Sequence, residues 1–162
     1  DFRAAERAFS LIVQVAGRAG RFTPDGRVVV QTLRPSSPVI RMAAAADVAG
    51  FQAAELRARR ELGFPPYSRL VRVVFRSKSA EKADRAAEAF ARLAAERLGP
   101  DDEALGPAEC PIALMAGNAR RHVVLKGPAM GPLHAACAAA LAALGELPGV
   151  HAEPDPDPVS LL

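Results

Sequence analysis

The sequence predicts an α/β chain in two parts: a helix and a buried strand, followed by an α+β layer of the ferredoxin-like, split βαβ type. Two observations predict this class. A Val-rich run at residues 27–33 follows an amphipathic helix, as at the end of an α/β sheet. Beyond a Pro-Pro pair, strand and helix patterns alternate in the order β-α-β-β-α-β. We therefore expect a boundary between Leu33 and Asp47, with the parts at residues 1–46 and 47–162.

The first helix is predicted by apolar residues that recur at alternating steps of three and four. These residues are Phe2, Ala5, Phe9, Ile12 and Ala16. Gln14, Arg18 and Arg21 stand at i, i+4 and i+7, so they share a stripe that points away from the core. Gly17 and Gly20 each cost about 1 kcal/mol relative to alanine inside a helix. Either the helix frays near Gly20 or something approaches its backbone closely.

The stripe has two interpretations. Guanidinium groups are forked, permanently charged donors that suit phosphate oxygens, and nucleoside triphosphatases use such arginine fingers to stabilise a transferring phosphoryl group. The alternative is that Arg18 and Arg21 are solvated residues on the polar face of an amphipathic helix. The i, i+4, i+7 spacing favours the anion-binding interpretation, and the segment resembles helicase motif VI.

Two further helices are expected before the second part begins its strands. Ser37 is a candidate N-cap before Pro38, which predicts a short helix to about residue 46. Asp47 caps a helix that runs to about residue 62, where Gly63 ends it.

The second part then begins with a strand over residues 69–76, in which Val71, Val73 and Phe75 share one face. Ser79 caps a helix to about residue 98, which carries apolar residues inward at Ala83, Ala87, Phe90 and Ala94. The remaining elements are one or two short strands in 104–115, a turn at Gly117-Asn118, a strand over 120–126, a helix over 131–144, a strand near Val150 and an extended Pro154–Pro158 tail.

Composition limits the functional classes. Residues 1–76 carry 13 arginines and 6 acids, whereas residues 77–162 carry 8 bases and 12 acids, so the first half is the expected partner for a polyanion. Arginine outnumbers lysine 18 to 3, which reflects phosphate recognition or high-GC coding. Cys110 and Cys137 form no CxxC pair, which argues against a zinc site or a disulfide framework. The sequence has no long apolar run and no signal peptide, so we expect a cytoplasmic protein without a membrane span.

Nucleotide-binding loops are missing from the sequence. It contains no Gly-x-x-x-x-Gly-Lys-Ser/Thr loop and no strand that ends in paired acids to hold magnesium. The first residue already lies inside the helix pattern, so we expect a C-terminal portion of a longer protein. This chain alone should not hydrolyse ATP.

Five segments together resemble the PriA family, primosomal protein N′, the bacterial replication restart helicases. They are Asp1–Arg7, Gln14–Arg21, Glu61–Arg69, Leu105–Pro107 and Asp155–Pro158. The resemblance spans the whole chain. It implies that residues 1–46 complete the second RecA-like helicase lobe and that residues 47–162 are the family's C-terminal domain. It also implies ATP and Mg²⁺ in the full-length protein, zinc bound only upstream, and no cofactor or metal bound by this chain alone.

The resemblance implies roles for individual residues. Gln14, Arg18 and Arg21 would face the γ-phosphate of ATP, with Arg21 as the catalytic finger and Arg18 as a second catalytic contact. The expected partners are branched or single-stranded DNA, single-strand-binding protein and other primosome proteins. In DNA binding, Arg120 and Arg121 would contact phosphates, together with Lys126.

Family members often place aromatic residues beside these arginines, and this chain has none there, which would weaken base stacking. An alternative makes Arg120 and Arg121 exposed edge-strand residues that discourage aggregation. The Arg57-Arg59-Arg60 cluster has two interpretations as well: it either suits the negative end of its helix dipole or contacts DNA.

The leading hypothesis is therefore a piece of an ATP-dependent DNA helicase that restarts stalled replication forks during primosome assembly. Its motif VI would supply arginine fingers to ATP. A second hypothesis is a stand-alone, non-catalytic module that binds DNA or single-strand-binding protein. A third is the product of a truncated gene.

Overall fold

The computed structural model describes residues 1–19 and 26–161. The chain forms two compact units, Asp1–Leu62 and Gly63–Leu162. The helix predicted over residues 48–62 thus belongs to the first compact unit, and the division falls 16 residues after the expected one. The assignment of residues 1–46 to a helicase lobe stays a prediction.

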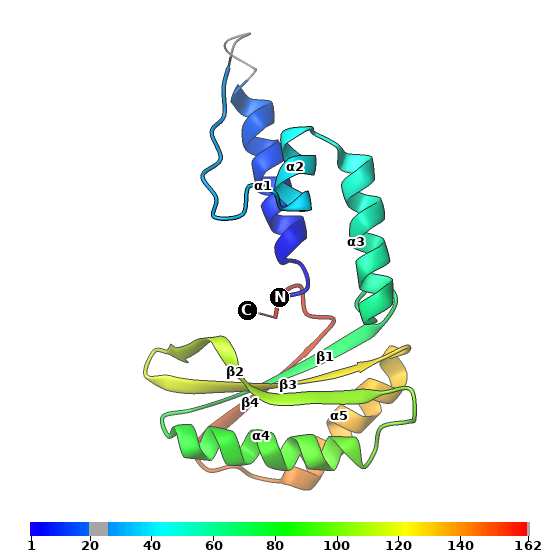
Figure 1. Cartoon of the computed structure of the whole chain (residues 1–162). Coiled ribbons are helices and arrows are strands. Elements are labelled where there is room, and N and C mark those ends of the chain that lie inside the picture. The colour runs from blue at the N-terminus through cyan, green and yellow to red at the C-terminus, as the bar shows by residue number, and fades with distance from the viewer. Residues whose placement is uncertain (20–25, 162) are drawn as a thin grey trace. The chain divides into compact units, whose positions relative to one another are not determined.

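Three helices make up the described part of the first unit: α1 (Ala4–Ala19), α2 (Pro38–Ala44) and α3 (Val48–Leu62) (Figure 1). All three were predicted from the sequence. Asp47 caps α3 by accepting a hydrogen bond from the Gly50 amide at 2.9 Å. The rings of Phe9 and Phe51 stack 4.0 Å apart and 5° from parallel, so α1 and α3 share one small core with Ala43. This stacking is the physical reason why α3 belongs to the first unit.

The strand predicted over residues 27–33 is wrong for this chain. These residues adopt no regular secondary structure, and Val29 is 91 % exposed. A strand needs a neighbour for its backbone hydrogen bonds, and within residues 1–19 and 26–62 the structure has no other strand. The described first unit therefore shows helices only, and no RecA-like lobe.

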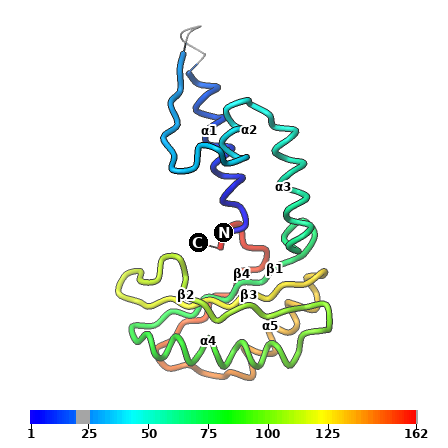
Figure 2. Tube along the Cα trace, in the orientation of Figure 1, coloured from blue at the N-terminus to red at the C-terminus, as the bar shows by residue number. Residues whose placement is uncertain are grey.

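The second unit has the predicted element order. Its strands and helices are β1 (Arg69–Ser77), α4 (Ala80–Ala95), β2 (Glu103–Met115), β3 (Asn118–Gly127), α5 (Met130–Leu144) and β4 (Val150–Pro156). The described strands form one antiparallel sheet in the order β2-β3-β1-β4. Both helices cover the same face of this sheet (Figures 1 and 2). This arrangement is compatible with a ferredoxin-like domain, as predicted.

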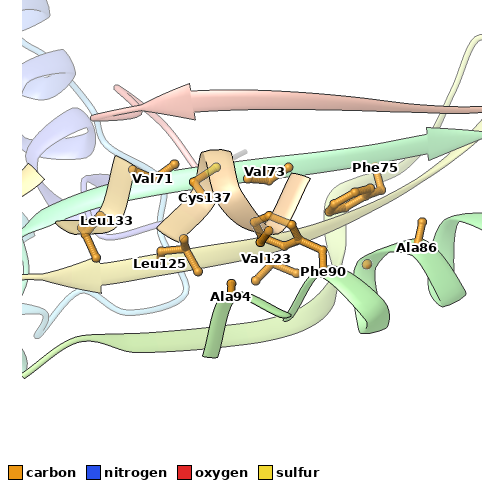
Figure 3. Packing of buried hydrophobic residues seen from close by; sticks show 12 residues of the cluster. Val71, Val73, Phe75, Ala86, Phe90, Ala94, Val123, Leu125, Leu133 and Cys137 are labelled. Atoms are coloured by element: carbon orange, nitrogen blue, oxygen red, sulfur yellow. The ribbon is translucent and has the colours of Figure 1, made fainter. Parts of the chain in front are cut away.

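The main core lies between that face and the two helices (Figure 3). Val71, Val73 and Phe75 of β1 point into it, and the Phe75 and Phe90 rings lie 5.4 Å apart. The predicted inward positions of α4 are all buried, and Ser79 accepts the capping hydrogen bond from the Lys82 amide. Burial of each large apolar side chain contributes about 1.5–3 kcal/mol, so this layer dominates the stability of the unit.

Strand β2 is one irregular strand of 13 residues, where the sequence predicted one or two short strands. Its pairing with β3 shifts register between Leu105 and Ala108, and again between Glu109 and Leu114. At the first shift Gly106 has φ +102°, and a Cβ there would lie 2.9 Å from the His122 carbonyl oxygen. Only glycine fits this position without strain.

The prolines of the predicted extended tail lie partly in β4, which is an edge strand. Pro154 and Pro156 pair in register with Val73 and Val71 of β1. Proline cannot donate to a backbone ladder, so an edge strand is where it is tolerated. The tail is therefore extended in the sheet as far as Pro156, and Asp157, with φ +48°, then turns the chain.

Candidate functional site

The predicted phosphate-binding stripe lies on α1, and the structure describes two of its three residues. Gln14 and Arg18 are both exposed, on the side of the helix away from the buried Phe9. Arg18 forms no ion pair with any residue in the described ranges 1–19 and 26–161. Arg21 and Gly20 lie outside the described residues. Both described side chains are therefore open to solvent.

Gly17 lies within the same helix, on its exposed side. Helix α1 continues through it to Ala19, and a Cβ at this position would meet no atom within 4 Å. The helix thus does not fray at Gly17. Space beside this part of its backbone is left open by the described residues.

A charged cluster fixes the start of α1 against α3. Glu6 accepts hydrogen bonds from Arg3 at 2.6 Å and from Arg59 at 2.8 Å, and Arg59 also binds Glu55 at 2.8 Å. The Arg59 guanidinium lies 5.3 Å from the centre of the Phe2 ring. Hydrogen bonding to Arg3, with further help from Arg59, lowers the pKa of Glu6 to about 2. The Arg59 side chain therefore binds partners within the first unit.

A groove of about 520 Å³ lies between α1 and α3. Its lining includes Phe9, Phe51 and Leu56, with the carboxylates of Glu6 and Glu55. Neither Gln14 nor Arg18 contributes to it. Gln14 and Arg18 thus lie on an open face of the helix and do not line this groove.

The structure places Arg121 on one face of the sheet, and Arg120 and Lys126 on the other. Arg121 pairs with Phe75 in the sheet register and so points to the helix side, where it forms ion pairs with Asp84 and Glu109. Its side chain is only 16 % exposed. Arg120 is the next residue along β3 and points to the opposite face.

Lys126 and Arg120 differ in the contacts that their charged groups make with the rest of the second unit. The Lys126 ammonium lies 2.5 Å from a Glu103 carboxylate oxygen and 5.5 Å from the centre of the Phe64 ring. Arg120 donates one hydrogen bond, from Nη1 to the carbonyl oxygen of Ile112 at 3.2 Å. Arg120 keeps the most donors for a phosphate, whereas Arg121 and Lys126 would have to exchange carboxylate partners for it.

Arg72 is a residue that the sequence analysis missed. It lies on β1 between Leu70 and Val74, on the sheet face opposite α4 and α5, and is 5 % exposed. It donates to the Ser160 carbonyl oxygen at 3.2 Å and contacts the Cys110 sulfur at 3.7 Å. Burial, followed by the charges of Arg72 and Arg120, lowers the pKa of nearby His122. An arginine that alternates with two apolar residues in a strand was the available indication.

Neither a metal site nor a membrane span is found in the part of the chain that the structure describes. Among residues 1–19 and 26–161, no three His, Cys, Asp or Glu side chains gather so as to hold a metal ion. Cys110 and Cys137 are both buried and free. Within the same ranges, no helix is long and apolar enough to cross a bilayer.

Comparisons with known proteins agree on one family. The family model described as "Primosomal protein N C-terminal domain" matches residues 60–159. The chain is similar to the replication restart protein PriA of Treponema pallidum, with 42 % identity over all 162 residues and 25 % of that relative. The PriA of Bacillus subtilis is 38 % identical over 78 % of this chain and 16 % of its own length. The PriA of Borreliella burgdorferi is 34 % identical over 76 % of this chain and 19 % of its own length.

Two features of these matches bear on the structure. The family model begins at residue 60, close to the division between the compact units at residues 62 and 63. The match to the Treponema relative covers the first unit as well. The chain spans a quarter or less of the length of these relatives.

Proposed function

The chain belongs to the family of the primosomal protein N C-terminal domain, and we propose that it is the C-terminal part of an ATP-dependent DNA helicase that restarts stalled replication forks. The observation that carries this proposal is the 42 % identity to a replication restart protein over the whole chain. This match includes the helix that presents Gln14 and Arg18 to solvent.

The proposed role of the α1 stripe is to contact the terminal phosphate of ATP. Arg21 acts as the arginine finger, Arg18 is a second cationic contact and Gln14 assists by hydrogen bonding. A guanidinium there stabilises negative charge that develops on the transferring phosphoryl group. ATP and its Mg²⁺ would be held by parts of the protein outside this chain, which has neither a phosphate-binding loop nor paired acids after a strand. The exposed Arg18, which forms no ion pair with the described residues, fits such a role.

We also propose that residues 1–46 complete a RecA-like lobe whose remainder lies outside this chain. Support comes from apolar residues that the described first unit leaves exposed. Leu11 and Val15 are exposed on α1, and Val29 and Leu33 are almost wholly exposed in a segment without regular secondary structure. A Val-rich segment without a neighbouring strand is what the end of a sheet would present when the other strands are absent.

Charge supports a contribution of the first unit to DNA binding. Residues 1–62 carry 10 basic and 6 acidic residues, whereas residues 63–162 carry 11 basic and 12 acidic ones. Binding of branched or single-stranded DNA by the second unit would therefore depend on a local group around Arg120 and not on net charge. Single-strand-binding protein and other primosome proteins complete the set of proposed partners.

A turnover assay on the full-length protein tests the central role. Arg21→Ala should lower DNA-stimulated ATP hydrolysis by about 10³-fold or more, because a lost arginine finger has that effect in related phosphoryl transfer. Arg41→Ala, which removes another exposed arginine of the first unit, is the matched control and should keep normal turnover. Normal turnover of Arg21→Ala would overturn the assignment.

A second candidate function is a non-catalytic module that binds DNA or single-strand-binding protein by itself. The observation in its favour is that residues 63–162 form a compact unit that nearly coincides with the matched family model. Equilibrium titration of the 162-residue chain with forked DNA, and with a peptide of the single-strand-binding-protein tail, tests this candidate. Absence of binding to both ligands would reject it.

A further inference from the structure

The sheet face opposite α4 and α5, here called the outer face, is buried along the middle of β1. Leu70, Arg72 and Val74 alternate with the core residues of β1, and all three are buried. Two segments of the second unit contact Arg72 on this face: the middle of β2, through Cys110, and the residues after β4, through Ser160. We call the latter segment, Asp157–Leu161, the strap.

The strap is fixed at its first residue. Asp157 adopts φ +48° and so turns the chain out of β4, while its amide donates to the Leu70 carbonyl oxygen at 2.8 Å. Its carboxylate receives two hydrogen bonds from Arg69, one of them from Nε at 3.0 Å. Pro158 is buried directly after this turn. The strap then continues on the side of the sheet away from α4 and α5 (Figure 1).

Arg72 links the strap to the edge strand on the far side of the sheet. Its Nη1 donates to the Ser160 carbonyl oxygen at 3.2 Å, and its Nη2 lies 3.7 Å from the Cys110 sulfur. Strand β3 lies between β1 and β2, so this one side chain spans a whole strand. Cys110 itself belongs to the stretch of β2 in which the register with β3 shifts, between Glu109 and Leu114.

The middle of β2 depends on such contacts because its backbone ladder is interrupted there. Where a ladder is irregular, fewer backbone hydrogen bonds hold the strand, and local opening costs less free energy. Side-chain contacts from outside the strand then contribute a larger share of what keeps it in place. Ile112 and Leu114, which follow Cys110, are already exposed apolar residues.

We propose that the strap is a latch for β2, with the Arg69–Asp157 pair as its catch and Arg72 as the connection. With the strap closed, Ser160 holds the Arg72 guanidinium against Cys110, and the middle of β2 stays in place. When the strap opens, Arg72 loses one of its partners and the middle of β2 opens more often, although Arg120 still binds the Ile112 carbonyl oxygen. Opening then exposes the Cys110 thiol and enlarges the apolar surface that begins at Ile112 and Leu114.

The test measures how fast the Cys110 thiol reacts with a thiol reagent in the full chain with Cys137→Ala. Arg69→Gln removes the catch, and Arg76→Gln is a matched control, since Arg76 of β1 and Glu153 of β4 form another partly exposed ion pair, at 2.7 Å. The side chains of Arg69 and Asp157 are 48 % and 43 % exposed, and those of Arg76 and Glu153 are 45 % and 50 % exposed. We expect Arg69→Gln to accelerate the reaction by about tenfold or more, as local opening does, and Arg76→Gln by less than about twofold. Equal effects of the two substitutions would overturn the latch.

Two further measurements keep the proposal testable if Cys137→Ala perturbs the core. Amide hydrogen exchange with both cysteines present should show Arg69→Gln speeding exchange in residues 109–114 while the core amides of β1 stay protected. In an Arg72→Met background, Arg69→Gln should produce no additional acceleration in residues 109–114, because the connection is already absent. Fully additive effects of Arg69→Gln and Arg72→Met would contradict the coupling.

Discussion

Arg59 of α3 and Glu6 of α1 join the two ends of the first unit's helical region, with Nη2 and Oε2 at 2.8 Å across 53 residues of sequence. The same guanidinium binds Glu55 one turn earlier on α3 and covers the Phe2 ring. This pair orients α1, the helix that presents Gln14 and Arg18. The position of the proposed phosphate contacts thus depends on an arginine that does not itself face a ligand.

Arg59→Ala should destabilise the first unit. The substitution removes both carboxylate partners and the aromatic contact from a mostly buried side chain, so we expect a loss of about 1–3 kcal/mol in the free energy of unfolding. Chemical denaturation of the 162-residue chain measures it. Arg57→Ala, on the exposed side of the same helix, should change stability by less than about 0.5 kcal/mol. Equal losses in both variants would show that the cluster has no special role.

The lowered pKa of Glu6 predicts a specific pH dependence of the stability of the chain. Its pKa in the folded chain is about 2, below the ordinary value of 4.5, so the ionised carboxylate favours the folded state. This contribution is complete above about pH 4.5 and is lost as the pH falls towards 2. We expect it to be about 1–2 kcal/mol, because the side chain is one-third exposed and water screens the pair.

The measurement compares the unsubstituted chain with Glu6→Gln at several pH values, so that other titrating carboxylates cancel. The difference in unfolding free energy should be largest above pH 4.5 and should shrink steadily below it. A difference that does not change between pH 6 and pH 3 would contradict the role given to the Glu6 carboxylate.

Gly17→Ala should act in opposite directions in the isolated chain and in the full-length protein. In the chain it should stabilise α1 by about 0.5–1 kcal/mol, because alanine is the better helix former and its Cβ meets nothing within 4 Å. In the full-length protein it should lower ATP turnover, since we expect another part of the protein to approach this backbone. Gly131→Ala, at the start of α5, has the same open surroundings and serves as the control. Full activity of Gly17→Ala would show that the glycine is merely tolerated.

Substitutions on β3 should separate DNA contact from structural roles. Arg120→Ala should weaken binding of forked DNA and reduce the salt dependence of the affinity by about one counterion, whereas Arg121→Ala should mainly lower stability through its lost ion pairs. Titrations at low and high salt, with a denaturation curve for each variant, measure both effects. Affinity that does not change with salt would argue against phosphate contacts by these arginines. The edge-strand alternative does not hold, because β3 lies between β2 and β1 in the sheet.

Local chemistry explains why the fold of the second unit could be predicted. Ser79 marks the start of α4, and the alternation of Val71, Val73 and Phe75 marks β1. Gly63 marks the end of α3, and Gly117 marks the turn between β2 and β3. Each of these features acts over a few residues. The strand predicted over residues 27–33 failed for the opposite reason, because a strand depends on neighbours that the described part of this chain does not supply.

The candidate site was predictable to a similar degree. The exposure of Gln14 and Arg18 follows from helical periodicity alone. The separation of Arg120 from Arg121 follows equally simply from the two-residue period of a strand, although the sequence analysis placed them in one group. Burial of Arg72 could not be predicted, since it depends on how β2 bends and where the strap lies.

The most direct test of the central claim is single-turnover ATP hydrolysis by full-length Arg18→Ala protein saturated with forked DNA. Arg18 is exposed on α1, so its removal should leave folding unchanged, and saturation with forked DNA removes the effect of any loss of DNA affinity. We expect a rate about 100-fold or more below that of the unsubstituted protein, as for the loss of a donor to transition-state charge. A rate equal to that of the unsubstituted protein would contradict the assignment of the α1 stripe to the terminal phosphate.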